Sequence, residues 1–141
     1  MRYRLLLAFA AFFLAAALAG ADQPASKVVL PVGKTTPTDG RQMFASYCAP
    51  CHGIDGRGSG PLAPALRIKP GDLTLLSRGH HGRFPEAQVV TVLQFGAQTP
   101  HSAMEMPAWG PILAKMNQSN HQARLLRISN LSRYLDTIQV R

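Results

Sequence analysis

The chain has 141 residues, with 15 Lys and Arg against 7 Asp and Glu, so its formal net charge is +8. This length suits one domain with one hydrophobic core. Nucleic acid is the generic partner of a basic chain, but the arginines are scattered instead of forming a stripe with interleaved aromatic residues. The acidic residues form no paired carboxylates and no Ser/His/Asp set, so neither kind of hydrolytic site is expected.

Residues 1–21 are predicted to be a secretory signal peptide. Arg2 and Arg4 supply a positive n-region, and the 15 residues from Leu5 to Ala19 are apolar and uncharged. The small residues 19–21 offer a cleavage site. Because the apolar run is shorter than the ~20 residues that span a bilayer core, we expect cleavage over a retained anchor. We therefore expect the protein to be exported to the periplasm without stable membrane insertion. Because the protein is exported, we expect no nucleic-acid partner. Loss of the two arginines leaves a net charge of +6.

Residues 22–37 contain three prolines and no helical period, so we expect a tail that wraps the domain or links it to the membrane side. The domain itself is predicted to span residues 38–141. Thr38 and Asp39 offer an N-cap, and a helix is predicted from there to about Tyr47. Gly40 and Phe44, four residues apart, share one face of this helix.

The pentapeptide Cys48-Ala49-Pro50-Cys51-His52 follows, and it is the attachment sequence for a c-type haem. Two thiols at this spacing can add to the two vinyl groups of one porphyrin. The adjacent histidine is then held beneath the iron as its proximal ligand. The chain has no internal repeat, so one covalent haem c is expected, and the attachment uses both cysteines of the chain.

Three other roles of a Cys-x-x-Cys pair fit the sequence less well. A thioredoxin-like redox pair opens a helix after a buried strand, whereas residues 40–47 lack a β-branched run and residues 53–60 contain four glycines. A structural disulfide would close a loop of only two residues, where strain is large and little unfolded-state entropy is removed. Zinc would need a second Cys/His pair at finger spacing, which does not follow.

The middle of the chain is punctuated by glycine and proline. Residues 53–60 are predicted to be a loop and residues 61–70 an extended segment. A short helical turn is expected at residues 72–79. The next helix is predicted to start at residues 84–86, with proline in its first turn, and to stop at Gly96. Its predicted apolar face comprises Val89, Val90, Leu93 and Phe95.

The C-terminal segment has the clearest helical pattern. Ser119 or Asn120 can cap it. Its apolar residues recur at spacings of three and four: Leu125, Ile128, Leu131, Leu135 and Ile138. The other face is predicted to carry Arg124, Arg127 and Arg133. Because no alternating run is long enough for a sheet, the predicted fold class is all-α.

A low-spin electron carrier needs a sixth iron ligand, and we predict Met106. It lies in a loop between two prolines, far enough from His52 to return over the opposite face of the haem. A residue before proline is held extended, which helps to project the Met106 sulfur into a pocket. Met104 is the second candidate. Histidine ligation is the other alternative, by His80, His81 or His101.

Four motifs carry a resemblance to a known family. They are Gly40-x-x-x-Phe44 before the Cys-Ala-Pro-Cys-His motif, Pro64-Ala65-Leu66 after the glycine-rich loop, Met106-Pro107-Ala108-Trp109-Gly110, and Leu131-x-x-Tyr134-Leu135. Over roughly residues 38 to 140 the chain resembles a class I c-type cytochrome of the bacterial periplasmic kind. The resemblance implies a cytochrome c fold in which the first and last helices cross at near right angles, with Gly40 permitting their close contact.

The resemblance also implies roles around the haem. A proline carbonyl after the motif would accept a hydrogen bond from the His52 ring, and Pro64 is the expected residue, with Pro61 as the alternative. Residues 61–83 depart from the short mitochondrial-type pattern, so partners for the haem propionates are not assigned one by one. The candidates for that role are Arg67, Lys69, Arg83 and Trp109.

The predicted function is one-electron transfer in the periplasm by a haem with His52 and Met106 as axial ligands, without catalysis by the chain itself. The chain would be a free shuttle or the cytochrome subunit of a respiratory oxidoreductase, as a monomer or in a complex. The family implies a dehydrogenase or quinol-oxidising complex as donor and an oxidase or reductase as acceptor, and basicity is expected to favour acidic partners. The alternative is a haem enzyme or gas-binding protein with a displaceable distal ligand.

Overall fold

The computed structural model describes residues 33–97, 106–116 and 120–140. These residues form helices and loops with no strand among them, which confirms the all-α prediction. The predicted signal peptide, most of the expected tail, Met104 and His101 lie outside the described residues. Among the described helices, none combines the length and the apolar character that a membrane span requires.

The first helical segment runs from Gly40 to His52 in three parts: α2 (Gly40–Met43), the π-helical turn η1 (Phe44–Cys48) and α3 (Ala49–His52). The carboxylate of Asp39 caps it, accepting a hydrogen bond from the backbone N–H of Gln42 at 2.8 Å. The segment continues beyond the predicted end at Tyr47, so the whole Cys-x-x-Cys-His motif is helical. It stops at Gly53, whose φ of 80° suits glycine.

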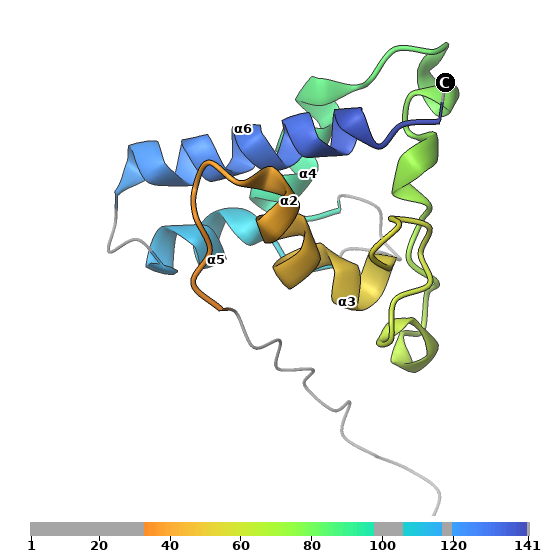
Figure 1. The fold of residues 1–141 in the computed structure, drawn as a ribbon, viewed down its shortest axis with the longest axis horizontal. Coiled ribbons are helices and arrows are strands. Elements are labelled where there is room, and N and C mark those ends of the chain that lie inside the picture. Colours follow the sequence, from red (N-terminus) through yellow and green to blue (C-terminus); the bar gives the residue numbers. More distant parts are fainter. Residues whose placement is uncertain (1–32, 98–105, 117–119, 141) are drawn as a thin grey trace, which may run out of the picture.

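The last helix, α6 (His121–Thr137), lies across α2 (Figure 1). The Asn120 side chain caps it by accepting a hydrogen bond from the N–H of Ala123 at 3.1 Å. At the crossing, a Cβ on Gly40 would collide with the backbone carbonyl of Asn130. Phe44 and Tyr134 also contact each other there, with ring centroids 5.2 Å apart. The expected close contact at Gly40 is therefore confirmed.

Two further helices complete the core. Helix α4 (Glu86–Phe95) stops at Gly96, as predicted. Helix α5 (Trp109–Met116) begins inside the segment predicted as a loop, with Pro111 in its first turn, where a missing N–H costs nothing. A Cβ on Gly110 would collide with the Gln94 carbonyl, so α5 approaches α4 closely. The largest fully buried side chains are Tyr47, Phe44, Met43, Leu113, Ile128 and Leu131.

Residues 53–83 form an outer wall of loops and short 3₁₀ turns, drawn in yellow and green in Figure 1. The turns are η2 (Ala63–Ala65), η3 (Leu73–Leu75) and η4 (Arg78–His80). The Asp72 carboxylate caps η3, accepting hydrogen bonds from Thr74 N at 2.8 Å and Thr74 Oγ1 at 2.6 Å. The backbone N–H of Leu73 donates to the Gly56 carbonyl at 2.7 Å, which ties η3 to the glycine-rich loop at the start of the wall.

Two side chains of α6 do not lie where the helical pattern predicted. Leu125, expected on the apolar face, is 40% exposed, and Arg127, expected on the polar face, is only 4% exposed. Arg127 is buried because the segment 33–36 packs over this part of α6 and supplies oxygen acceptors to the guanidinium. Helical periodicity does not reveal which segment will cover a helix face, so the sequence alone misplaced Arg127.

Candidate functional site

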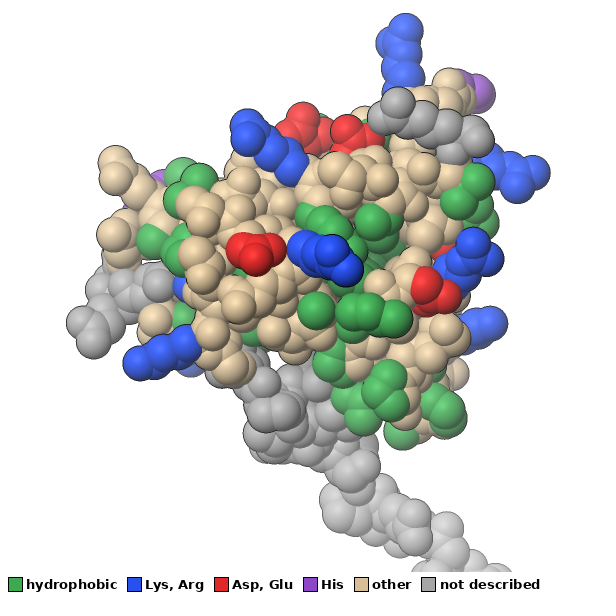
Figure 2. All heavy atoms as spheres, viewed as in Figure 1, with side chains coloured by type: hydrophobic (Ala, Val, Ile, Leu, Met, Phe, Trp, Pro, Cys, Tyr) green, Lys and Arg blue, Asp and Glu red, His purple; other side chains and the backbone are tan. Residues whose placement is uncertain are grey.

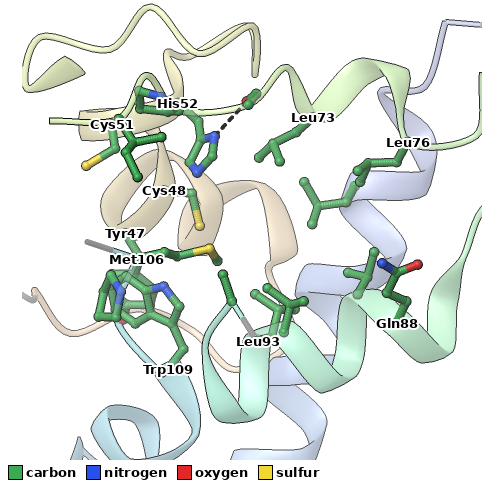
Figure 3. Close-up of a pocket in the computed structure, with 18 of the residues that line it drawn as sticks. Tyr47, Cys48, Cys51, His52, Leu73, Leu76, Gln88, Leu93, Met106 and Trp109 are labelled. Atoms are coloured by element: carbon green, nitrogen blue, oxygen red, sulfur yellow. Dashed lines mark hydrogen bonds between the residues drawn. The ribbon is translucent and has the colours of Figure 1, made fainter. Parts of the chain in front are cut away.

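An apolar cavity of about 310 Å³ lies between the end of α3, the outer wall, α4 and the start of α5 (Figure 3). The outer wall contributes aliphatic side chains from residues 66–76, and α4 contributes a second aliphatic surface. The main aliphatic lining residues are Leu66, Leu73, Leu76, Val89, Val92 and Leu93. Such a lining excludes water and favours a large apolar ligand.

The end of η1 and the following helical turn, α3, bring both thiols and the imidazole of the motif to this cavity. Cys48 is buried and Cys51 half-buried, and both are free thiols. Burial, and to a smaller extent the neighbouring Cys51, raises the pKa of the Cys48 thiol to about 12. Burial also raises the pKa of Cys51. A thioredoxin-like nucleophile has a lowered thiol pKa, so these thiols have the opposite electrostatic environment.

The ring of His52 is fixed by the outer wall. Its Nδ1 donates a hydrogen bond to the carbonyl of Gly71 at 3.0 Å, which leaves Nε2 with its lone pair facing the cavity (Figure 3). Burial lowers the pKa of His52, and the hydrogen bond to Gly71 opposes part of this effect. The neutral ring is therefore favoured, and the neutral ring is the form that ligates a metal.

The acceptor of this hydrogen bond corrects the expectation for Pro64. Pro64 lies in η2 outside the cavity lining, and neither it nor Pro61 accepts from His52. The outer wall contacts the histidine ring at Gly71, beyond both prolines. Gly58 makes this approach possible, because a Cβ there would collide with the carbonyl of Pro70.

Met106 enters the cavity from the segment before α5. In Figure 3 its sulfur points into the space that the His52 ring enters from the other side, with the Cys48 thiol between them in this view. Both side chains line the same cavity. The structure thus brings together the two residues predicted to ligate iron, although their sequence positions are more than fifty residues apart. Their ligation of iron stays a prediction.

Trp109 forms part of the cavity wall at the start of α5. It is 3% exposed and stacks on Tyr47, with ring centroids 5.2 Å apart and an interplanar angle of 25°. Both rings line the cavity. Of the other candidates for propionate contacts, Lys69 also lines the cavity, whereas Arg67 and Arg83 do not. Sequence reasoning missed Tyr47 as a wall residue, and its position directly before Cys48 was the available signal.

His80, one of the alternative iron ligands, also lines the cavity. Its Nδ1 lies 2.9 Å from the Leu76 carbonyl and its Nε2 lies 2.8 Å from Oε1 of Gln88. Each ring nitrogen of His80 therefore has a hydrogen-bond partner within the protein.

The donor set at the cavity suits a covalently attached haem. Aliphatic and aromatic side chains form an apolar cavity, and the two thiols that line it are available for attachment to the vinyl groups of the porphyrin. A neutral imidazole nitrogen and a thioether sulfur are available as axial ligands. These groups come from α3 on one side and from the segment preceding α5 on the other.

Comparison with known proteins agrees with this geometry. Residues 35–122 match the family model described as Cytochrome C oxidase, cbb3-type, subunit III. The matched range includes the Cys-x-x-Cys-His motif, Met106 and Trp109. No curated protein and no solved structure matches the chain.

Proposed function

The chain belongs to the family of cbb3-type cytochrome c oxidase subunit III, a family of c-type cytochrome domains, and from this premise we propose that it is a periplasmic one-electron carrier with His52 and Met106 as axial ligands. Family membership gives a role in electron transfer with covalently bound haem c. The single haem, its two axial ligands and the periplasmic location are parts of the proposal.

The observation that carries the proposal is the convergence of His52 and Met106 on one apolar cavity that both thiols also line. When bound, the haem iron supplies one-electron oxidation and reduction between ferric and ferrous states. The carbonyl of Gly71 holds the His52 ring in the orientation and tautomer that present Nε2. His52 and Met106, held on opposite sides of the cavity, would keep the iron coordination unchanged between the two oxidation states, so little reorganisation would accompany electron transfer.

Charge around the cavity supports docking to an acidic redox partner. The outer wall, residues 53–83, carries two acidic residues, Asp55 and Asp72, and Asp55 lies 3.9 Å from Arg57. The basic residues of the wall are Arg57, Arg67, Lys69, Arg78 and Arg83. On the face shown in Figure 2 the Lys and Arg side chains are spread out instead of forming one stripe. We propose that this wall faces the donor or acceptor, whether the chain is a shuttle or a subunit of a respiratory oxidoreductase.

Carbon monoxide binding distinguishes this carrier from the alternative, a haem enzyme or gas-binding protein with an open iron site. We expect the reduced protein to bind carbon monoxide slowly and weakly, because the Met106 sulfur occupies the position that the gas needs. Flash photolysis or stopped-flow mixing measures the binding rate. The matched control is Met106→Leu, in which the ligand is removed and binding should become fast. Equally fast binding by the wild type would favour the open-site protein.

A further inference from the structure

Arg127 is a buried cation, and its positive charge has a function if the protein carries electrons. Its side chain is 4% exposed. Nη1 donates to Thr35 Oγ1 at 2.6 Å, and Nη2 donates to the Thr35 carbonyl at 2.6 Å. Nη1 also lies 3.5 Å from the sulfur of Met43. Within the part of the chain that the structure describes, Nε has no partner and no carboxylate lies within ion-pair distance of this guanidinium.

All the acceptors of Arg127 are therefore neutral. Burying a charge with no opposite charge beside it is costly, and even buried ion pairs are often replaced by apolar residues of similar volume without loss of stability. Arg127 holds the segment around Thr35 against α6, but that contact alone does not require a full positive charge. The charge itself is the feature that needs a function.

A directed chain of hydrogen bonds connects this cation to the cavity wall. The hydroxyl of Tyr47 donates to the carbonyl of Gly33 at 3.0 Å, so in the pair of hydroxyls the proton comes from Thr35 and Tyr47 accepts it. Thr35 in turn accepts from Arg127. Tyr47 lines the cavity and stacks on Trp109. One threonine hydroxyl thus separates the guanidinium from an aromatic ring of the haem cavity.

We propose that Arg127 tunes the reduction potential of this domain by placing a fixed positive charge behind the Tyr47 wall. The inference rests on the proposed electron-carrier function. Reduction adds one electron to the haem, and a nearby cation stabilises the reduced form. A guanidinium is the side-chain group that proteins keep charged, and the burial of Arg127 protects the effect from screening by salt. A unit charge at a distance on the order of 10 Å, with an effective dielectric constant of about 20, changes an equilibrium constant about tenfold.

The test is the midpoint potential of the haem-loaded protein in five variants. Arg127→Met and Arg127→Gln remove the charge, and Arg127→Lys keeps it. Thr35→Val weakens the anchor of the N-terminal segment but leaves the charge in place. Arg133→Met removes an exposed charge from the same helix. We expect the two neutral variants to lower the ratio of reduced to oxidised protein about tenfold at a fixed ambient potential. A tenfold change in this ratio corresponds to a fall of about 59 mV in the midpoint potential for one electron. The other three variants should stay within about twofold of the wild type.

Three results would overturn the proposal. The first is a neutral variant that has an unchanged spectrum and whose ratio of reduced to oxidised protein stays within about twofold of that of the wild type. The second is a shift in Thr35→Val as large as that in the neutral variants, because the effect would then be structural. The third is failure of both neutral variants to accumulate as haem-loaded protein, which would assign Arg127 to folding alone. Failure of the proposed function is separate, since it would already show in the wild-type spectrum before any variant is made.

Discussion

The double variant Cys48→Ala/Cys51→Ala is expected to release all of its haem into acidified acetone, whereas the wild-type protein should retain its haem on the polypeptide. The two thiols are the only cysteines in the chain, and both line the cavity beside His52. Removing them leaves no atom that could form a thioether to the porphyrin. The haem content of the precipitated polypeptide, measured after the extraction, gives the result directly.

Single variants and a matched control make this prediction sharper. Each single cysteine variant keeps one thioether, so its haem should resist extraction but show a reduced band at longer wavelength, because one vinyl group stays conjugated. Pro50→Ala changes one of the two residues between the cysteines and keeps both thiols, so its haem should remain fully covalent. Covalent haem in the double variant would contradict the assignment of the Cys-x-x-Cys-His motif.

Replacing the distal ligand should have the second large effect. Met106→Leu keeps much of the side-chain volume but removes the sulfur that faces the cavity opposite His52. A thioether ligand raises the potential of haem iron. We therefore expect a fall on the order of 0.1 V, within the ≈ 0.8 V range that axial ligands set. The ferric spectrum should also become high-spin or show an exchanged ligand. Spectroelectrochemical titration measures both changes in one sample.

Met116→Leu is the matched control for this experiment. Met116 is half-buried at the end of α5 and packs against the core outside the cavity lining. Its replacement should leave both the spectrum and the potential near those of the wild type. Met104→Leu tests the second candidate ligand in the same way. If Met104→Leu gives the high-spin spectrum and Met106→Leu does not, the choice of Met106 is wrong.

Features that depend on neighbouring residues in the chain could be predicted from the sequence. Asp39 and Asn120 cap their helices through side chains that reach only three residues along the backbone. Gly96 ends α4 in a conformation with φ of 83°, which glycine adopts at no steric cost. The Cys-x-x-Cys-His motif predicts its chemistry because its donors lie within a single helical turn of one another.

Features that depend on segments far apart in the sequence were predicted poorly. The partner of His52 is Gly71, whereas the family resemblance pointed to Pro64 or Pro61, earlier in the outer wall. Arg127 seemed to belong to a polar helix face, and its burial arises from Thr35, which lies 92 positions earlier in the sequence. Helix α5, which begins at Trp109 inside the predicted loop, likewise packs closely on α4 at Gly110.

The candidate site divides in the same way. The proximal side, with His52, could be predicted from one local motif. The distal side could not, because Met106 reaches the cavity only through the packing of the whole fold. Tyr47 and Trp109 meet only after α5 has packed beside the first helical segment. Spacing alone therefore suggested candidates for the distal side, and the packed structure brought Met106 and Trp109 to the cavity.

The visible spectrum of the oxidised and reduced protein, matured in a host that assembles c-type haem, tests the central claim most directly. We predict the reduced α band of a c-type haem together with the weak ferric charge-transfer band of a methionine–iron bond. A c-type spectrum without the methionine band would contradict ligation by Met106 and favour two histidines or an open site. Protein that carries no covalent haem would contradict the electron-carrier function itself.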